Sequence, residues 1–267
     1  MYVAACVQLR SGPEIRDNIA RVEALVARAA ASGAALVATP ENTTFLGPSD
    51  EKVALAEPLD GPTHRALGAV ARRLRVHLLV GSVAERCDAK RCYNTSVLFG
   101  PDGEIIAAYR KIHLFDVSIP GGPELRESAF VAPGDAVVVA RTALGNIGMS
   151  ICYDLRFPEL YRRLVDAGAE VLTVPSAFTL HTGRDHWHPL LRARAIEGQA
   201  WVLAPAQEGR HDTGGLRHSY GHSLIADPWG VVVAERPDGE GICLAEIDLE
   251  SVRRVRASMP VAAHRRL

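Results

Sequence analysis

Three residues whose types suit acyl-transfer chemistry, Cys152, Glu41 and Lys111, each follow a predicted strand. The three strands span residues 35–38, 104–109 and 146–151. An unperturbed thiol is mostly protonated at neutral pH, and a carboxylate that accepts its proton turns it into a nucleophile. An ammonium group stabilises the oxyanion that forms when the thiol attacks a carbonyl carbon. If the three strands lie side by side in register, the sequence predicts a thiol–carboxylate–ammonium site.

The position of Cys152 strengthens this prediction. The thiol stands at the C-terminal end of a strand, before a turn into the helix that Pro158 opens, where α/β proteins place their chemistry. The backbone N–H of Tyr153 is then directed at an oxyanion above Cys152. Each residue also has a purely structural explanation: a buried cysteine for Cys152, and a surface ion pair for Glu41 and Lys111. The presence of all three together favours the site.

The elements around these residues alternate between strands and helices. About a dozen strands are predicted, at residues 2–9, 35–38, 76–82, 94–99, 104–109, 137–142, 146–151, 171–174, 201–206, 219–226, 231–234 and 241–247. Helices begin near residues 15, 61, 158, 190 and 249, and Pro189 is placed in the first turn of the fourth. Turn sequences at 100–103 and 227–230 require antiparallel pairs, so mixed sheets in an α/β fold are expected.

The composition is that of an ordinary globular chain. Of its 267 residues 48% are hydrophobic and 23% charged, with a net charge of −1, so no nucleic-acid partner is indicated. No apolar run approaches the roughly 18 residues of a membrane helix, and the N-terminus lacks the pattern of a signal peptide. The five scattered cysteines favour a reducing cytoplasm over a disulfide framework. We therefore expect a cytoplasmic protein with a single domain over residues 1–267 and no membrane partner.

Three segments resemble the signature motifs of the nitrilase superfamily, the carbon–nitrogen hydrolases. They are Thr39-Pro-Glu-Asn42, Tyr109-Arg-Lys-Ile-His-Leu-Phe-Asp116 and Ser150-Ile-Cys-Tyr-Asp-Leu-Arg-Phe-Pro-Glu159. Segments of the C-terminal third are similar to the Nit branch, and within it more to the deaminated-glutathione amidases than to the ω-amidases. These segments span residues 177–183, 186–187, 190–197, 204–211, 219–223 and 227–230.

The resemblance implies a four-layer α-β-β-α sandwich of two mixed sheets, and a homodimer or higher homo-oligomer joined through helices. It implies that Cys152 is the nucleophile, that Glu41 is the general base, and that Lys111 holds the oxyanion together with the Tyr153 N–H. Glu127, inside a loop rich in Gly and Pro at 120–123 and 133–134, matches a second glutamate that positions the lysine and assists proton transfer. No cofactor and no metal are implied.

The resemblance also implies a substrate: glutathione whose glutamyl amine has become a ketone. Hydrolysis releases α-ketoglutarate and cysteinylglycine, a reaction of metabolite repair. Arg156, one turn past the thiol, suits the keto-acid carboxylate, since a guanidinium binds carboxylates through two hydrogen bonds. Phe178 is predicted to form a pocket wall, and His186 and Trp187 to line the entrance. The alternatives are a helix-surface arginine and plain packing roles.

Competing functions remain open at this point. Within the class they are an ω-amidase acting on α-ketoglutaramate and an N-carbamoyl amino acid hydrolase. Asp185 and His188 depart from the Gly-x-Ala-His-Trp-Glu pattern common in the family, which bears on substrate choice. A metallohydrolase is disfavoured because the six histidines at 181, 186, 188, 211, 218 and 222 lack a helical His-x-x-x-His pair with an acidic partner. The last alternative is a non-catalytic interaction protein, against which the complete Glu41–Lys111–Cys152 set speaks.

Overall fold

The fold is built on two mixed sheets. The computed structural model describes residues 1–118, 124–211 and 217–266, so the loop at 120–123 lies outside the described residues. The first sheet has the order β17 (Gly241–Ile247), β1 (Tyr2–Gln8), β2 (Ala34–Ala38), β3 (His77–Arg86), β4 (Cys92–Phe99) and β5 (Ile105–Arg110), and β8 (Val131–Ala132) also pairs with β4. The second has the order β16 (Val232–Arg236), β15 (Ser223–Ala226), β12 (Trp201–Ala204), β11 (Val171–Thr173), β10 (Gly145–Met149) and β9 (Val139–Thr142).

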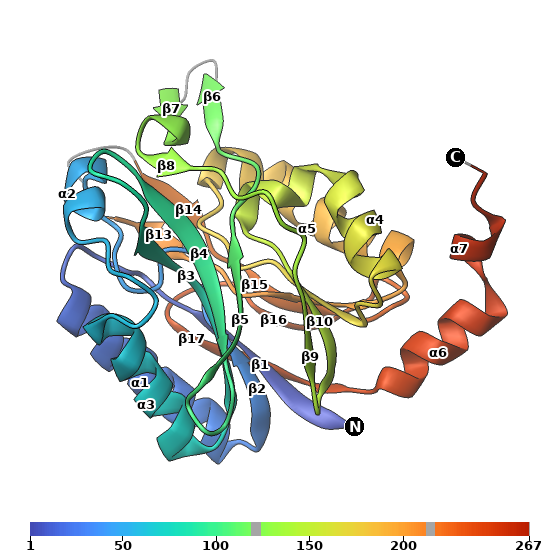
Figure 1. The fold of residues 1–267 in the computed structure, drawn as a ribbon. Coiled ribbons are helices and arrows are strands. Elements are labelled where there is room, and N and C mark those ends of the chain that lie inside the picture. Colours follow the sequence, from blue (N-terminus) through green and yellow to red (C-terminus); the bar gives the residue numbers. More distant parts are fainter. Residues whose placement is uncertain (119–123, 212–216, 267) are drawn as a thin grey trace.

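Helices cover the outer face of each sheet (Figure 1). The first sheet packs against α1 (Ile15–Ala31) and α3 (Pro62–Leu74), and the second against α4 (Pro158–Asp166) and α5 (Leu180–Gly198). The remaining elements are α2 (Ser49–Ala54), α6 (Leu249–Ser258), α7 (Val261–His264), the ribbons β6 (Asp116–Ser118)–β7 (Glu124–Arg126) and β13 (Glu208–Arg210)–β14 (His218–Tyr220), and 3₁₀ turns at Glu127–Ala129 and Cys152–Arg156. The predicted α-β-β-α sandwich is confirmed.

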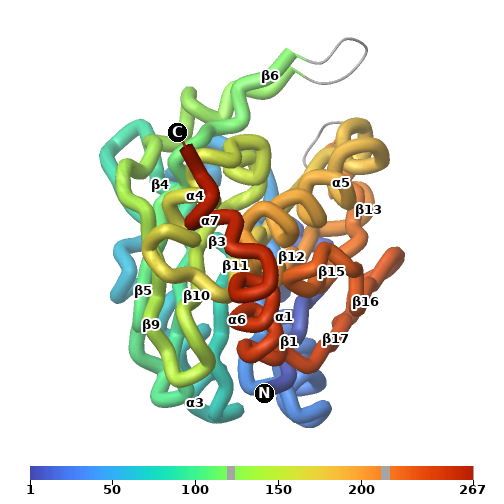
Figure 2. Tube along the Cα trace, turned by 90° about the vertical axis from the view of Figure 1, so that its right-hand side faces the viewer, coloured from blue at the N-terminus to red at the C-terminus, as the bar shows by residue number. Residues whose placement is uncertain are grey.

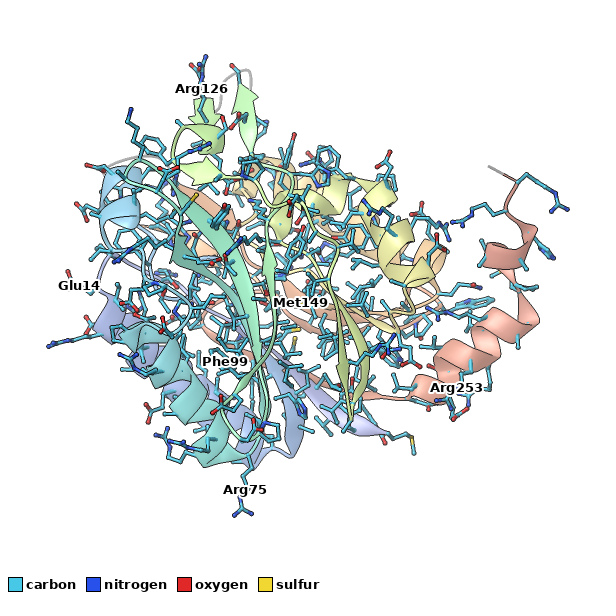
Figure 3. The ribbon with its side chains drawn as sticks, in the orientation of Figure 1. Glu14, Arg75, Phe99, Arg126, Met149 and Arg253 are labelled. Atoms are coloured by element: carbon cyan, nitrogen blue, oxygen red, sulfur yellow. The ribbon has the colours of Figure 1, made fainter. Side chains whose placement is uncertain are left out.

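Alternating side chains on the central strands separate two hydrophobic cores. On β1, Ala4 and Cys6 face the second sheet, whereas Ala5 and Val7 face the helices of the first layer. Met149 of β10 lies between the two sheets, while Arg75, just after α3, and Arg253 of α6 point outward (Figure 3). Central strands such as β2 and β12 bury both faces and are almost continuously apolar, whereas the edge strands β5, β9 and β16 are partly exposed.

The two sheets approach each other closely at Gly81 of β3. A Cβ on Gly81 would lie 2.0 Å from the carbonyl oxygen of Thr39 and 2.4 Å from the Cβ of Pro175. Thr39 precedes the Glu41 loop, and Pro175 accepts a hydrogen bond from the Cys152 N–H at 2.9 Å. A side chain at position 81 therefore separates the two segments that carry the predicted catalytic residues.

We expect Gly81→Ala to lower the free energy of unfolding by about 3 kcal/mol, because the rigid backbone on both sides cannot move away from an added methyl group. Denaturant titration measures this. Gly12→Ala is the matched control, since a Cβ there meets no atom within 4 Å. Equal stability of the two variants would contradict the close approach.

The structure corrects three predictions. The helix expected at 190–196 begins at Leu180, so Pro189 lies inside α5 and not in its first turn. The single strand expected at 219–226 is divided into β14 and β15, because the backbone turns at Gly221 and His222, where φ is +77° and +57°. The described residues form seventeen strands and seven α-helices, more than predicted, since elements of two to six residues leave little periodicity in a sequence.

The C-terminal segment projects beside the layers but is joined to them, since Val252 of α6 is buried and Arg256 donates to the carbonyl oxygen of Ala169 at 2.7 Å. Figure 1 shows α6 and α7 extending away from the sandwich, and Figure 2, turned by 90°, looks onto them. Trp201 ties the start of this segment to the second sheet through a 3.1 Å hydrogen bond from its Nε1 to the carbonyl oxygen of Asp248.

No helix among the described residues is long and apolar enough to span a membrane.

Candidate active site

Glu41, Lys111 and Cys152 converge between the sheets, at one end of the strands that precede them. Glu41 follows β2, Lys111 follows β5, and Cys152 comes shortly after β10. The expectation that these strands lie side by side is wrong. In the first sheet β3 and β4 separate β2 from β5, and β10 belongs to the second sheet. Glu41 and Lys111 meet across the end of the first sheet, and Cys152 reaches them because the two sheets pack face to face.

Lys111 is held between two carboxylates. Its Nζ lies 2.8 Å from Oε1 of Glu41, and 3.1 and 2.9 Å from the two carboxylate oxygens of Glu127. The Lys111 side chain is only 2% exposed, so water contributes little to its solvation. The structure thus brings Glu127 to the position beside Lys111 that the resemblance implied.

Asn94 of β4 links the two carboxylates. Its Nδ2 donates to Oε1 of Glu41 at 2.9 Å and to Oε1 of Glu127 at 3.2 Å. The other oxygen of Glu41 accepts a hydrogen bond from the Ala177 N–H at 2.9 Å. Sequence reasoning missed Asn94, because an asparagine inside a predicted strand carries no local signal of its position between two acids.

The charges of the site fix its resting protonation state. Burial raises the pKa of the Cys152 thiol well above its usual range, and the Glu41 carboxylate raises it further. Burial also works against the ionised form of Glu41, but Lys111 outweighs it and lowers the pKa of Glu41. Burial lowers the pKa of Lys111, but Glu127 and Glu41 outweigh it, so this pKa is raised. The site therefore rests as thiol, carboxylate and ammonium, with a proton acceptor beside the thiol.

The turn that presents Cys152 is strained and tightly held. Cys152 has a φ of +46°, a conformation that residues other than glycine rarely adopt. The fully buried carboxylate of Asp154 accepts hydrogen bonds from the Ile151 N–H at 2.9 Å and from the Tyr109 hydroxyl at 2.7 Å. It also accepts one from the His113 N–H at 3.1 Å. Tyr109 stands two residues before Lys111 in the chain. Asp154 therefore fastens the turn of Cys152 to the strand that leads to the ammonium group.

Asp154→Asn is expected to lower the free energy of unfolding by about 2–3 kcal/mol and kcat/KM by at least about tenfold. The new amide group faces donors where the carboxylate accepted hydrogen bonds, and the Cys152 turn shifts. Denaturant titration and steady-state kinetics measure the two effects. Asp166→Asn, which changes a partly exposed surface ion pair with Arg265, should alter neither. A wild-type kcat/KM in the Asp154 variant would refute the positioning role.

The loop that carries Glu41 is fastened in a similar way. Asn42 has a φ of +57°, and the buried Gln207 holds the loop through Nε2, which donates to the carbonyl oxygen of Glu41 at 3.0 Å. The same Nε2 donates to Oγ of Ser11 at 2.8 Å. Gln207 lies in the 204–211 segment that the sequence singled out by resemblance, but its contact with the Glu41 loop spans 166 positions.

A cavity of about 700 Å³ opens above Cys152, Glu41 and Lys111. Its size is typical of small-molecule sites. Apolar side chains form part of its wall: Phe45, Leu46, Phe115, Leu125, Phe130, Val131 and Leu180. Four cationic side chains also line it: Lys52, Arg126, Arg184 and Arg217. Glu124 also lines the cavity and pairs with Arg126 at 3.3 Å, so an anionic molecule with an apolar middle suits the wall best near Lys52, Arg184 and Arg217. Sequence reasoning missed the four cations, since they come from separate helices, a strand and a loop.

The predicted substrate-binding residues form a group beside the cavity. The Arg156 guanidinium lies 5.2 Å from the centre of the Phe178 ring and 5.9 Å from that of Tyr153, and its Nη1 lies 3.3 Å from Nδ1 of His186. Trp187 is fully buried, so it does not line the entrance as predicted and has the packing role that was the alternative. None of these five residues, all of them described, is part of the cavity lining.

Comparison with known proteins defines the class. Residues 3–257 match the carbon–nitrogen hydrolase family, and the chain belongs to it. It is 44% identical over 268 residues to the deaminated glutathione amidase of Synechocystis sp. (strain PCC 6803 / GT-S), covering 99% of this chain and 98% of that protein.

Two solved structures have the same fold. Saccharomyces cerevisiae Nit3, a member of branch 10 of the nitrilase superfamily, superposes with a TM-score of 0.89 at 33% identity, covering 100% of this chain and 97% of that one. The second is an amidase of Nesterenkonia sp. AN1, solved as a glutamate-to-glutamine mutant with acrylamide added to its active-site cysteine. It superposes with a TM-score of 0.81 at 25% identity, covering 98% of this chain and 100% of that one.

Proposed function

We propose that this chain is a cysteine-dependent amidase that hydrolyses deaminated glutathione through a thioester on Cys152. The observation that carries the proposal is the Cys152 thiol at the base of a cavity with four cations on its wall, beside a carboxylate that contacts a buried ammonium group. The similarity to the Synechocystis deaminated glutathione amidase over nearly the full length of both chains supports the substrate.

In the first half-reaction the Cys152 sulfur attacks the carbonyl carbon of the side-chain amide, and Glu41 accepts the thiol proton. Lys111 and the Tyr153 N–H stabilise the oxyanion. When the C–N bond breaks, protonated Glu41 returns its proton to the departing amine. Cysteinylglycine leaves, and an α-ketoglutaryl thioester remains on Cys152.

In the second half-reaction Glu41, again a carboxylate, removes a proton from water, and the resulting hydroxide attacks the thioester. The C–S bond breaks, Cys152 regains a proton from Glu41, and α-ketoglutarate leaves. Glu127 keeps Lys111 ionised and in place through both steps, since its two oxygens lie 3.1 and 2.9 Å from Nζ. All groups needed belong to the chain, the substrate and one water molecule.

The wall of the cavity supports the larger of the related substrates. Deaminated glutathione has a carboxylate at each end and spans three residues, whereas α-ketoglutaramate has one carboxylate and would leave most of about 700 Å³ empty. Arg184 of α5 and Arg217, which both line the cavity, offer guanidinium groups for carboxylates. We propose that Arg156, in contact with Phe178 and His186, helps to hold the keto-acid end of the substrate although none of these three described residues lines the cavity.

The test compares kcat/KM for deaminated glutathione, α-ketoglutaramate and an N-carbamoyl amino acid under the same conditions. We expect deaminated glutathione to be preferred by at least about 100-fold, the discrimination that about 2.7 kcal/mol of additional transition-state binding provides. A preference for α-ketoglutaramate would assign an ω-amidase, and a preference for the carbamoyl compound would assign the third activity. Hydrolysis of none of the three would reject the substrate assignment.

We further infer that the chain folds as a single domain and acts in the cytoplasm. We also infer that it forms a homodimer. Ile196 on α5 and Trp229 in the turn after β15 are large apolar side chains that remain exposed, and Gly230 of that turn lies against Ile196. Such a surface on a helix of the outer layer favours self-association. Sedimentation velocity should give a dimer that Ile196→Lys dissociates, and a monomeric wild-type chain would contradict it.

A further inference from the structure

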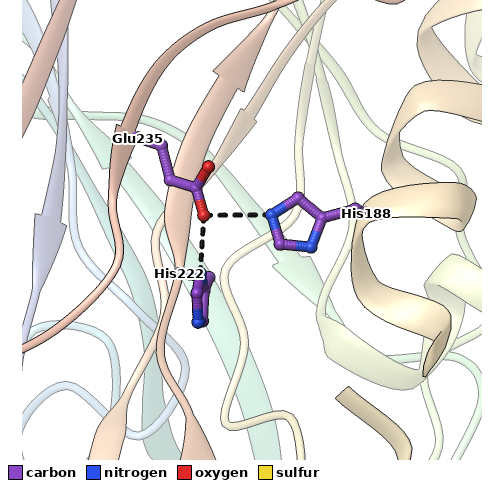
Figure 4. A group of neighbouring side chains, drawn as sticks. All are labelled: His188, His222 and Glu235. Atoms are coloured by element: carbon purple, nitrogen blue, oxygen red, sulfur yellow. Dashed lines mark hydrogen bonds and ion pairs between the residues drawn. The ribbon is translucent and has the colours of Figure 1, made fainter. Parts of the chain in front are cut away.

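Two histidines and a glutamate meet on the side of the second sheet, outside the catalytic cavity. His188 comes from α5, His222 from the turn between β14 and β15, and Glu235 from the edge strand β16 (Figure 4). Nε2 of His188 lies 3.0 Å and Nδ1 of His222 2.5 Å from the same oxygen of Glu235, and the three atoms lie within 4.8 Å of one another. Elements distant in sequence thus direct three potential ligand atoms at one point.

The set has the chemistry of a divalent transition-metal site. Imidazole nitrogens and a carboxylate oxygen are ordinary ligands of Zn²⁺, and three protein ligands leave a fourth position for water. With metal–ligand bonds of about 2.0–2.1 Å, neighbouring ligand atoms of a tetrahedral site lie about 3.3 Å apart. To reach this value the flexible Glu235 side chain must move back from separations of 2.5 and 3.0 Å, and the two imidazole nitrogens, which lie within 4.8 Å of each other, must adjust as well.

Neighbouring side chains hold His222 in place. The Tyr220 ring stacks on His222 with 4.2 Å between ring centres, and the Trp187 indole donates to the carbonyl oxygen of His222 at 2.8 Å. Such contacts orient a ligand side chain before metal arrives.

Access from solvent is open. The side chains of His188, His222 and Glu235 are 30%, 24% and 30% exposed, so an ion and its water can enter without opening the fold. None of the three, all of them described, lines the catalytic cavity. Arg184, one turn before His188 on the same helix, does line it.

We propose that His188, His222 and Glu235 form a Zn²⁺ site that ties α5 to the edge of the second sheet. The site is separate from the amide chemistry, which needs only Cys152 and its neighbours. Its role is to hold the helix that contributes Arg184 to the cavity wall. Both histidines belong to the six weighed as metal ligands from the sequence, but the pattern shows no acidic partner for them, because the ligands lie on three elements and Glu235 stands 13 positions after His222.

The test titrates metal-stripped protein with Zn²⁺ in competition with a chromophoric chelator. The Cys152→Ala background is used so that the catalytic thiol cannot bind the metal. We expect one Zn²⁺ per chain. His188→Gln and Glu235→Gln should each reduce the Zn²⁺ affinity by at least about 10-fold, because even the loss of a residue that only hydrogen-bonds to a metal ligand costs about 10- to 100-fold. His264→Gln, which changes an exposed histidine of α7, is the matched control and should bind as tightly as the parent.

Two further measurements distinguish this site from adventitious binding. Zn²⁺ should raise the Tm of the parent by several degrees and leave that of the His188 and Glu235 variants unchanged, since only the native site binds. Co²⁺ in place of Zn²⁺ should show absorption of a nitrogen–oxygen ligand set without a thiolate charge-transfer band. Stoichiometric binding that survives both substitutions, or no binding by the parent, would overturn the proposal and leave the cluster as a hydrogen-bonded clip.

Discussion

Cys152→Ala is expected to lower kcat for amide hydrolysis by at least about 10⁴-fold while the chain stays folded. Loss of a nucleophile removes the covalent route, and what remains is catalysis by binding and oxyanion contacts alone. The substitution keeps the backbone conformation at φ +46° equally strained, so the unfolding midpoint should shift little. Single-turnover kinetics and circular dichroism measure the two quantities.

Cys87→Ala is the matched control, because Cys87 is a free, partly exposed thiol that lies outside the catalytic cavity. It should retain wild-type activity. Alkylation should likewise inactivate the wild-type chain and the Cys87 variant at equal rates. If the Cys152 variant kept a tenth or more of the wild-type kcat, the nucleophile would have to be sought elsewhere.

Lys111→Met is expected to cost about 3–5 kcal/mol in the free energy of unfolding as well as at least about 100-fold in kcat. The Glu41 and Glu127 side chains are 5% and 16% exposed, and without Lys111 they face each other with no buried counter-charge. The oxyanion also loses a charged donor. Denaturant titration at neutral pH and steady-state kinetics give both numbers.

A second substitution separates the two effects. Lys111→Met combined with Glu127→Gln should regain part of the stability, since one of the two facing charges is gone, but none of the activity. Lys90→Met, at an exposed lysine, should change neither quantity. Unchanged stability of the Lys111 single variant would show that the two carboxylates do not depend on its charge.

Much of this molecule is predictable from local sequence, and the limits are physical. Strands such as β1 and β17 and helices such as α3 follow from apolar periodicity and from glycine and proline at their ends. Glu41, Lys111 and Cys152 were found because each stands at the end of a strand inside a distinctive motif. Pairing neighbouring strands does not predict how they meet, because β3 and β4 stand between the strands of Glu41 and Lys111, and Cys152 comes from the second sheet.

The residues that hold the site in place were missed for the same reason. Apart from the contact of Asp154 with Ile151, Asp154, Asn94 and Gln207 act through partners 33 to 196 positions away, and no period or motif records such a distance. The start of α5 was misplaced because Pro189 removes a donor and crowds the preceding turn, a local penalty that packing overrides. Buried Trp187, Leu191 and Ala195 on one face of this helix supply that packing.

The central claim is that the amide is cleaved through a thioester on Cys152. Quenching the reaction with deaminated glutathione during the first turnover, followed by intact-protein and peptide mass spectrometry, tests it most directly. We predict an adduct with the mass of one α-ketoglutaryl group, on the peptide that contains Cys152, which forms and decays at rates that account for kcat. Release of α-ketoglutarate at the full rate with no acyl adduct on any cysteine would contradict the account.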